Sequence, residues 1–65
     1  MKIIVNGQSL DVTATLLDAA LAELGYGEAR VATALNGKFV PAPARAGARL
    51  GDGDRLEILA PMQGG

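Results

Sequence analysis

Side chains that could act as nucleophiles, general bases or metal ligands are scarce in this sequence. The chain contains no Cys and no His, which excludes thiolate chemistry, disulfides, hydrolase triads and the usual zinc sites. Asp52 and Asp54, in the stretch "GDGD", carry oxygens that suit calcium, but a calcium loop needs several more oxygen ligands at fixed spacing. The composition of this stretch predicts a turn instead.

The C-terminal stretch is the second place where chemistry could reside; it consists of Pro61, Met62, Gln63, Gly64 and Gly65. Pro61 has no backbone N–H and tends to end a strand, so we expect a flexible tail from this residue onward. Five extended residues reach about 17 Å, and a terminus without Cβ atoms can enter a channel too narrow for other residues. Taken alone, the tail fits a frayed end or a cloning remnant as well as a functional terminus.

Length and charge limit the classes of protein to which the chain can belong. A single domain of 65 residues buries only about 60% of the surface of its unfolded chain, which leaves little volume for an internal active site. Six basic and seven acidic residues give a net charge of -1, without the clustered cations and stacking aromatics of nucleic-acid binders. No apolar run is long enough for a membrane span or a secretory signal. We therefore expect no nucleic-acid or membrane partner, and a cytoplasmic location.

Two Asn-Gly dipeptides predict two hairpins, because this pair is preferred in two-residue type I′ turns. Around Asn6-Gly7, the alternation of apolar residues predicts a register with the apolar side chains on one face and opposite charges on the other. The predicted pairs are Val5 with Gln8, Ile3 with Leu10, Met1 with Val12, and Lys2 with Asp11. Around Asn36-Gly37, a shorter hairpin joins "VATAL" to "KFV", and Pro41 and Pro43 end its return strand.

A helix is predicted between the two hairpins. Thr15 is the expected N-cap, with Asp18 three residues later in the capping-box position. Gly25 provides the C-terminal stop and is followed by a surface Tyr26. The apolar residues at helical spacing form one face: Leu17, Ala20, Leu21 and Leu24. We expect this face to pack on a sheet.

The remaining segments complete the predicted order of elements. Residues 41–49 form a loop that can hold a helical turn, and residues 55–60 form the last strand. In that strand the apolar Leu56, Ile58 and Ala60 alternate with Arg55, Glu57 and Leu59. One helix with one apolar face is best covered by a mixed sheet of four to five strands wrapped around it. This is an α+β, ubiquitin-like β-grasp architecture, with a domain over residues 1–60 and a tail over residues 61–65.

A β-grasp order that ends in Gly-Gly resembles the ubiquitin-like proteins, and most closely the sulfur carrier proteins of thiamine biosynthesis. The resemblance covers nearly the whole chain and rests on "ALNGKFVP" at 34–41 and "LGDGDRLEILAPMQGG" at 50–65, with "IIVNGQ" in support. Family members typically carry Arg and a small polar residue after the proline that corresponds to Pro41, and an aromatic residue a little later. This chain has Ala42, Pro43 and then Arg45, which puts the partner contacts of this loop in doubt.

The resemblance implies a carrier that serves as a protein co-substrate and is not itself an enzyme. A separate adenylating enzyme would use ATP and Mg²⁺ to activate the Gly65 carboxylate, and sulfur from a cysteine desulfurase relay would convert it to a thiocarboxylate for thiazole synthase. Gly64, with Gln63, Met62 and Pro61, would occupy the channel of the partner. The lack of Cys agrees with this role, because no side-chain thiol can hold the sulfur. No cofactor is expected on the chain itself.

Exposed apolar residues near the last strand are candidates for a patch that docks the adenylating enzyme: Leu59, Phe39 and Met62. Phe39 could instead belong to the core. Two other interpretations of the whole chain remain open. The small subunit of molybdopterin synthase shares the fold and the Gly-Gly end but is usually longer, and a ubiquitin-like binding module would dock through its sheet without using its tail.

Overall fold

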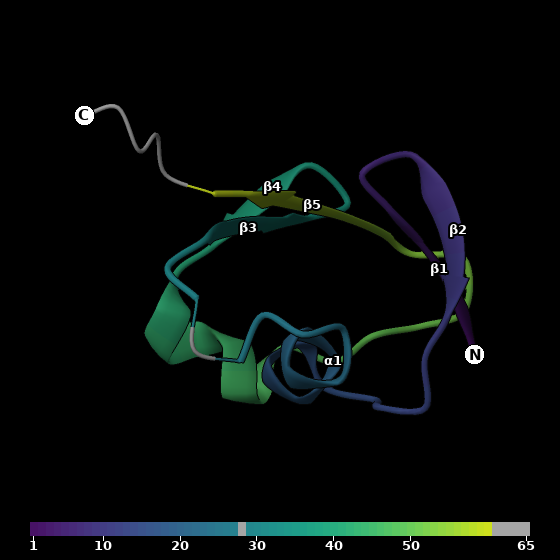
Figure 1. Cartoon of the computed structure of the whole chain (residues 1–65), viewed down its shortest axis with the longest axis horizontal. Coiled ribbons are helices and arrows are strands. Elements are labelled where there is room, and N and C mark those ends of the chain that lie inside the picture. Colours follow the sequence, from purple (N-terminus) through teal and green to yellow (C-terminus); the bar gives the residue numbers. More distant parts are fainter. Residues whose placement is uncertain (28, 61–65) are drawn as a thin grey trace.

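The computed structural model describes residues 1–27 and 29–60. These residues form five strands, one α-helix and one 3-10 helix (Figure 1). In chain order the elements are β1 (Lys2–Val5), β2 (Gln8–Asp11), α1 (Leu17–Glu23), β3 (Ala32–Leu35), β4 (Lys38–Val40), the 3-10 helix η1 (Ala42–Gly47) and β5 (Arg55–Leu59). The predicted order of elements is confirmed, and η1 is the helical turn expected in the loop.

The first hairpin has the predicted register. The Asn6-Gly7 turn has φ angles of 49° and 84°, the two positive values that a type I′ turn requires. Met1 and Val12 extend the ladder, because the Val12 N–H donates to the Met1 carbonyl at 2.8 Å and the Met1 ammonium donates to the Val12 carbonyl at 2.7 Å. Lys2 Nζ lies 3.8 Å from Asp11 Oδ1, which completes the predicted charge pair.

The second hairpin is also confirmed. Asn36 and Gly37 have φ angles of 51° and 85°, and β3 pairs with β4 in an antiparallel register. Thr33 of β3 is buried, and its hydroxyl donates a hydrogen bond of 2.8 Å to the carbonyl of Val40. At Pro41 the chain leaves β4 and enters η1, so the predicted end of the return strand is confirmed.

Strand β5 joins the two hairpins into one sheet with the order β2-β1-β5-β3-β4. It runs parallel to β1, where Leu56 pairs with Val5, and antiparallel to β3, where Leu59 pairs with Ala32. Leu56 and Ile58 are buried as predicted. The strand ends at Leu59, so the predicted inward position of Ala60 is wrong: it follows the strand and is exposed.

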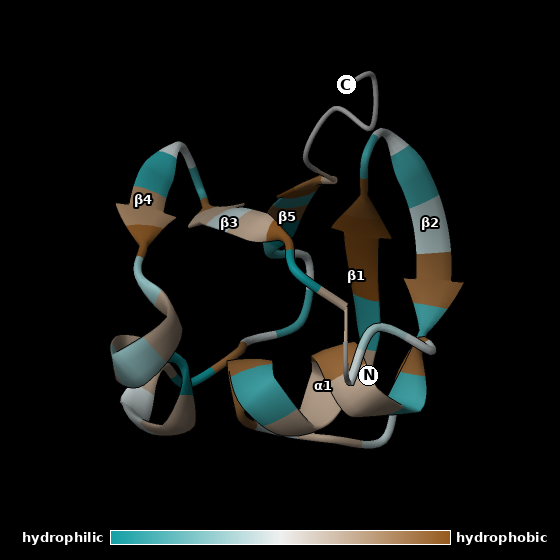
Figure 2. Ribbon diagram, turned by 60° about the vertical axis from the view of Figure 1, so that its left-hand side comes forward, coloured by the Kyte–Doolittle hydropathy of each residue, from teal (hydrophilic) through white to brown (hydrophobic). Residues whose placement is uncertain are grey.

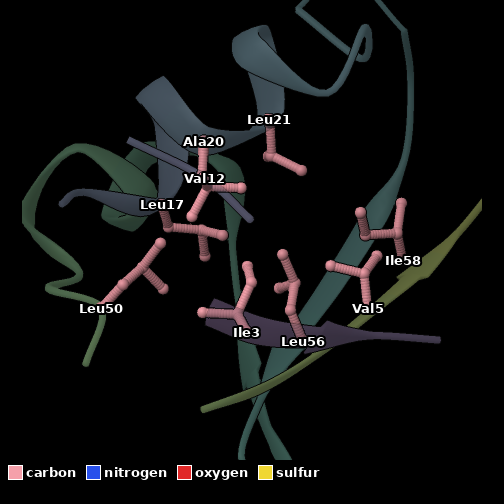
Figure 3. Close-up of a cluster of buried hydrophobic side chains, with 9 residues drawn as sticks. All are labelled: Ile3, Val5, Val12, Leu17, Ala20, Leu21, Leu50, Leu56 and Ile58. Carbon is pink, nitrogen blue, oxygen red and sulfur yellow. The ribbon is translucent and has the colours of Figure 1, made fainter. Parts of the chain in front are cut away.

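Helix α1 lies against the concave side of the curled sheet (Figure 1). Its predicted apolar face is confirmed, because Leu17, Ala20 and Leu21 are buried and Leu24 packs against them. Figure 3 shows Leu17, Ala20 and Leu21 pointing toward residues of the sheet and toward Leu50 in the loop before β5. The core cluster consists of Ile3, Val5, Val12, Leu17, Ala20, Leu21, Leu50, Leu56 and Ile58.

The predicted N-cap of the helix is wrong. Helix α1 begins at Leu17 with Leu16 in the cap position, and no side chain caps it. The N–H of Leu17 donates to the carbonyl of Ala48 at 2.9 Å, so a distant backbone carbonyl serves as acceptor where Thr15 was expected to act. Asp18 Oδ1 accepts the neighbouring N–H of Ala19 at 2.7 Å.

The predicted C-terminal stop is confirmed, with one correction. Gly25 has a φ angle of 96°, and the Gly25 and Tyr26 N–H groups donate to the carbonyls of Ala22 and Leu21 at 3.1 and 2.7 Å. This is a Schellman motif, in which the residue after the glycine packs back on the helix. Tyr26 is accordingly half-buried against the core and does not lie on the surface as predicted.

The distribution of apolar residues agrees with this architecture. Figure 2 shows β1 as a largely apolar, brown strand above α1, whereas the hairpin turns are mainly hydrophilic. Among the described residues, no helix combines the length and the apolar character that crossing a bilayer would require. A mixed sheet of five strands around one helix is the predicted ubiquitin-like β-grasp fold.

Candidate functional site

The predicted functional terminus starts where β5 ends. The predicted tail residues lie outside the described part of the chain: Pro61, Met62, Gln63, Gly64 and Gly65. Their roles, and the division into a domain over 1–60 and a tail over 61–65, stay predictions. The structure shows instead how the strand that leads to them is held, and which surface surrounds its end.

Both hairpin turns bind β5 through an asparagine side chain. Asn6 Oδ1 accepts the N–H of Ile58 at 2.8 Å, and Asn6 Nδ2 donates to the Ile58 carbonyl at 3.1 Å. On the other side of the strand, Asn36 Oδ1 accepts the N–H of Arg55 at 2.9 Å, and its Nδ2 donates to Asp54 Oδ1 at 3.1 Å. The sequence analysis assigned these asparagines only a turn geometry, because nothing local indicates that β5 is their neighbour.

Leu59 and Phe39 are both exposed, at 69% and 70%. They lie on the face of the sheet opposite α1, where Leu59 pairs with Ala32 and Phe39 pairs with Ala34. The two alanines lie two residues apart on β3, on the side opposite the buried Thr33. We call Leu59, Ala32, Ala34 and Phe39 the outer patch. Phe39 therefore does not belong to the core.

The carboxylates of the "GDGD" stretch bind backbone groups, as expected for a turn. Asp52 Oδ1 accepts the N–H of Lys2 at 2.8 Å, and Asp54 Oδ2 accepts the N–H of Gly51 at 2.7 Å. Within residues 1–27 and 29–60, no group of three or more acidic side chains is placed to hold a metal ion. The Asp52 carboxylate thus fastens the loop before β5 to β1, and the Asp54 carboxylate closes the turn within that loop.

Glu23, at the end of α1, binds the connection that precedes the helix. Its two carboxylate oxygens accept the N–H of Thr13 at 3.0 and 2.9 Å, and Oε1 also accepts the N–H of Ala14 at 3.0 Å and the Thr13 hydroxyl at 3.1 Å. The backbone N–H groups of Thr13 and Ala14 lower the pKa of Glu23 below its ordinary value, because they stabilise the ionised form.

An open pocket of about 470 Å³ lies beside the end of the sheet at which β5 stops; it is lined by Ala29, Arg30, Val31, Ala42 and Arg45. Arg45 links η1 to β3, since Nη2 donates to the carbonyl of Val31 at 2.6 Å and Nε donates to the Thr33 hydroxyl at 3.1 Å. The sequence analysis noted Arg45 only as a departure from a family pattern. The pocket depends on contacts between segments far apart in sequence, so no local signal predicted it.

Comparisons with known proteins agree with the fold and extend to the end of the chain. Residues 3–65 match the model of the ThiS family. A curated protein of Paramagnetospirillum magneticum named thiazole synthase is 38% identical over 66 residues, which cover the whole of this chain. The chain spans only 20% of the length of that relative.

Two solved structures are similar over the whole of this chain. The crystal structure of a thiamine biosynthesis protein, ThiS, from Geobacter metallireducens is 30% identical, with a TM-score of 0.84 and 100% of both chains covered. A solution structure of a thiamine biosynthesis protein from the same organism is 29% identical, with a TM-score of 0.79 and 88% of that chain covered. On the match of its sequence over residues 3–65 and the agreement of its fold, the chain belongs to the ThiS family.

Proposed function

We propose that this chain is a sulfur carrier of thiamine biosynthesis that holds sulfur as a thiocarboxylate on Gly65. The observation that carries the proposal is the extent of the family match, which runs from residue 3 through residue 65 and includes Gly64 and Gly65. A frayed end or a cloning remnant gives no reason for a family match to continue to the last residue. Family membership likewise favours this role over the molybdopterin-synthase type and over a module that does not use its tail.

The proposed chemistry begins with activation of the terminal carboxylate. On a separate adenylating enzyme, which holds ATP and Mg²⁺, the Gly65 carboxylate attacks the α-phosphate and forms an acyl-adenylate with release of pyrophosphate. A persulfide sulfur supplied through a cysteine desulfurase relay then attacks the carbonyl carbon, and AMP leaves. A thiol reductant cleaves the resulting acyl disulfide, which leaves the thiocarboxylate on Gly65 and oxidises the thiol to a disulfide. Activation is needed because a free carboxylate has no good leaving group. The chain is thus a co-substrate of its partner enzymes.

The geometry around β5 supports this role. The outer patch exposes two large apolar side chains, Leu59 and Phe39, beside the exposed Glu57, which pairs with Ala34. Exposed large apolar side chains that gather on one face are typical of protein–protein contacts. An enzyme that covers this patch also covers the end of β5 and Ala60, after which the last five residues reach about 17 Å when extended. The side-chain bonds of Asn6 and Asn36 hold β5 in place, so the tail is presented from a fixed base.

The proposed acceptor of the sulfur is thiazole synthase. A protein bearing that name contains, within a fifth of its length, a stretch that is similar to the whole of this chain. The presence of both in one protein supports a direct transfer between carrier and synthase. Because activation consumes ATP, the proposal has the carrier acting in the cytoplasm.

Intact mass spectrometry tests the proposal. The purified chain is incubated with ATP, Mg²⁺, the matching adenylating enzyme, a cysteine desulfurase and cysteine. We expect the mass to rise by the difference between one sulfur and one oxygen atom, and to return to its starting value once thiazole synthase and its substrates are added. Reactions without ATP, and reactions of a chain that lacks Gly65, are the controls. A chain whose mass never changes would contradict the proposal.

A further inference from the structure

The described lining of the pocket beside the end of β5 contains basic side chains. Its lining combines three apolar residues with two guanidinium groups: Ala29, Val31, Ala42, Arg30 and Arg45. None of these described lining residues is acidic, and the ion pair found among residues 1–27 and 29–60 joins Lys2 to Asp11 in the first hairpin. The described lining therefore carries two cations and no anion, while Glu28, which precedes Ala29 in the sequence, lies outside the described residues.

One of these arginines is preorganised by the wall of the pocket. Arg45 is half-buried, and its Nε and Nη2 groups are held by the Thr33 hydroxyl and the Val31 carbonyl. These bonds use two of the five N–H donors of the guanidinium and fix its plane. Arg30 is exposed and directly precedes Val31. A fixed cation beside an exposed one, next to apolar lining residues, suits an anionic group that is surrounded by apolar surface.

The position of the pocket decides between a nucleotide and a protein as the source of that anion. Leu59, the last residue of β5, pairs with Ala32, which directly follows Val31, so the pocket adjoins the base of the tail. A nucleotide that reacts with Gly65 lies about 17 Å from this base when the tail is extended, out of reach of the arginines. A protein that holds the extended tail, in contrast, must cover the surface around its base.

We propose that Arg30 and Arg45 bind an Asp or Glu carboxylate of the adenylating enzyme. This inference rests on the proposed function and adds a polar contact to the apolar outer patch. The contact favours the correct partner and fixes the orientation of the carrier relative to the enzyme. Charge complementarity across an interface contributes more to specificity and register than to raw affinity. The guanidinium group of Arg45 is held in an orientation that can bind the carboxylate, and the exposed Arg30 side chain completes the contact.

Charge reversal at Arg30 tests the pocket without disturbing the fold, since this exposed side chain makes none of the hydrogen bonds recorded among the described residues. Arg49→Glu is the matched control, because Arg49 is exposed and lies outside the pocket lining. Adenylation is followed by release of pyrophosphate at varied carrier concentration. We expect Arg30→Glu to raise KM about tenfold or more with kcat unchanged, because the reversal places like charges opposite each other.

The control should stay within about twofold of wild type, and added salt should raise the KM of the wild type more steeply than that of Arg30→Glu. Arg30→Ala, with a smaller rise in KM, preserves the test if charge reversal lowers stability. Equal KM values for Arg30→Glu and Arg49→Glu overturn the inference, and so does a fall in kcat at constant KM. If the wild type is adenylated and one of these two results is found, only the proposed pocket contact is rejected. If the wild type is never adenylated, the proposed function is rejected as well.

Discussion

Asn6 and Ile58 exchange two hydrogen bonds, although 52 residues separate them in the sequence. The side-chain amide of Asn6 offers one acceptor and one donor, as a backbone peptide group does. It therefore continues the hydrogen-bond ladder between β1 and β5 beyond the end of β1. Asn6, which adopts the positive φ of the turn, thereby also anchors the strand that leads to the proposed functional terminus.

Replacing Asn6 by Gly separates the two roles of this residue. Gly tolerates the positive φ of the turn, but it loses both side-chain bonds to Ile58. We expect a loss of about 1 kcal/mol or more in the free energy of unfolding, measured by urea denaturation. Asn36→Gly, which removes the bonds to Arg55 and Asp54, should act similarly. A variant with the wild-type midpoint would show that these amides serve only the turn.

A pair of identical substitutions tests the core assignment. Leu21→Ala should lower the free energy of unfolding by about 2 to 5 kcal/mol, because the side chain is buried in the core cluster. Leu59→Ala makes the same chemical change at an exposed site and should stay within about 0.5 kcal/mol of wild type. Thermal and urea midpoints of the two variants give the comparison. Equal losses would mean that the face of α1 is wrongly assigned.

The outer patch is tested by variants that leave the core unchanged. Phe39→Ala and Leu59→Ala should raise the KM for the adenylating enzyme by about tenfold each, since truncating a large apolar side chain at the centre of an interface costs on the order of 1 to 2 kcal/mol. Lys38→Ala is the control, because its side chain leaves the strand on the opposite face. If all three variants bind equally, the enzyme does not dock on this face.

The role of the C-terminus is tested by changes to the length of the tail and to the size of the residue at position 64. Deleting Gly65, appending one Ala and replacing Gly64 by Val should leave the unfolding midpoint unchanged, because the core cluster spans only Ile3 to Ile58. Each should abolish productive adenylation: the first two misplace the carboxylate, and the branched side chain of the third obstructs a narrow channel. Pyrophosphate release and intact mass report the result. Wild-type rates in all three would exclude the Gly-Gly end as the site.

The stability of the domain should fall in acid partly through Glu23. Its pKa in the folded chain lies below the ordinary value of 4.5, so the unfolded chain binds the proton more readily and stability is lost as pH falls through this range. Urea midpoints from about pH 7 to about pH 3 should decline less for Glu23→Gln than for wild type. Glu57→Gln, which removes an exposed carboxylate from β5, controls for the change in net charge. Parallel profiles for Glu23→Gln and wild type would contradict this role.

Features set by neighbouring residues could be predicted from the sequence. Asn6-Gly7 and Asn36-Gly37 restrict their own backbone angles, so both turns follow directly, and the alternation beside the first turn fixes its register. The apolar spacing of α1 and the stop at Gly25 are equally local. The Gly-Gly end was identified through a family resemblance, which the match over residues 3–65 confirms at the level of the family.

Features that depend on distant segments could not be predicted in this way. The cap of α1 is provided by Ala48, which lies 31 residues after Leu17 along the chain. The central position of β5 and its parallel pairing with β1 depend on the packed core, and so do the bonds of Arg45 that shape the pocket. No periodicity within a single segment reports these contacts, because each is decided by which segments become neighbours.

The central strand of the sheet is also the last of the described strands to be synthesised. On the ribosome, each hairpin can form as soon as it has emerged, because its contacts are local in sequence. The hairpins cannot join before Arg55–Leu59 is available, since in the order β2-β1-β5-β3-β4 neither pairs with the other. A translation product that stops short of this strand therefore cannot join its two hairpins into one sheet.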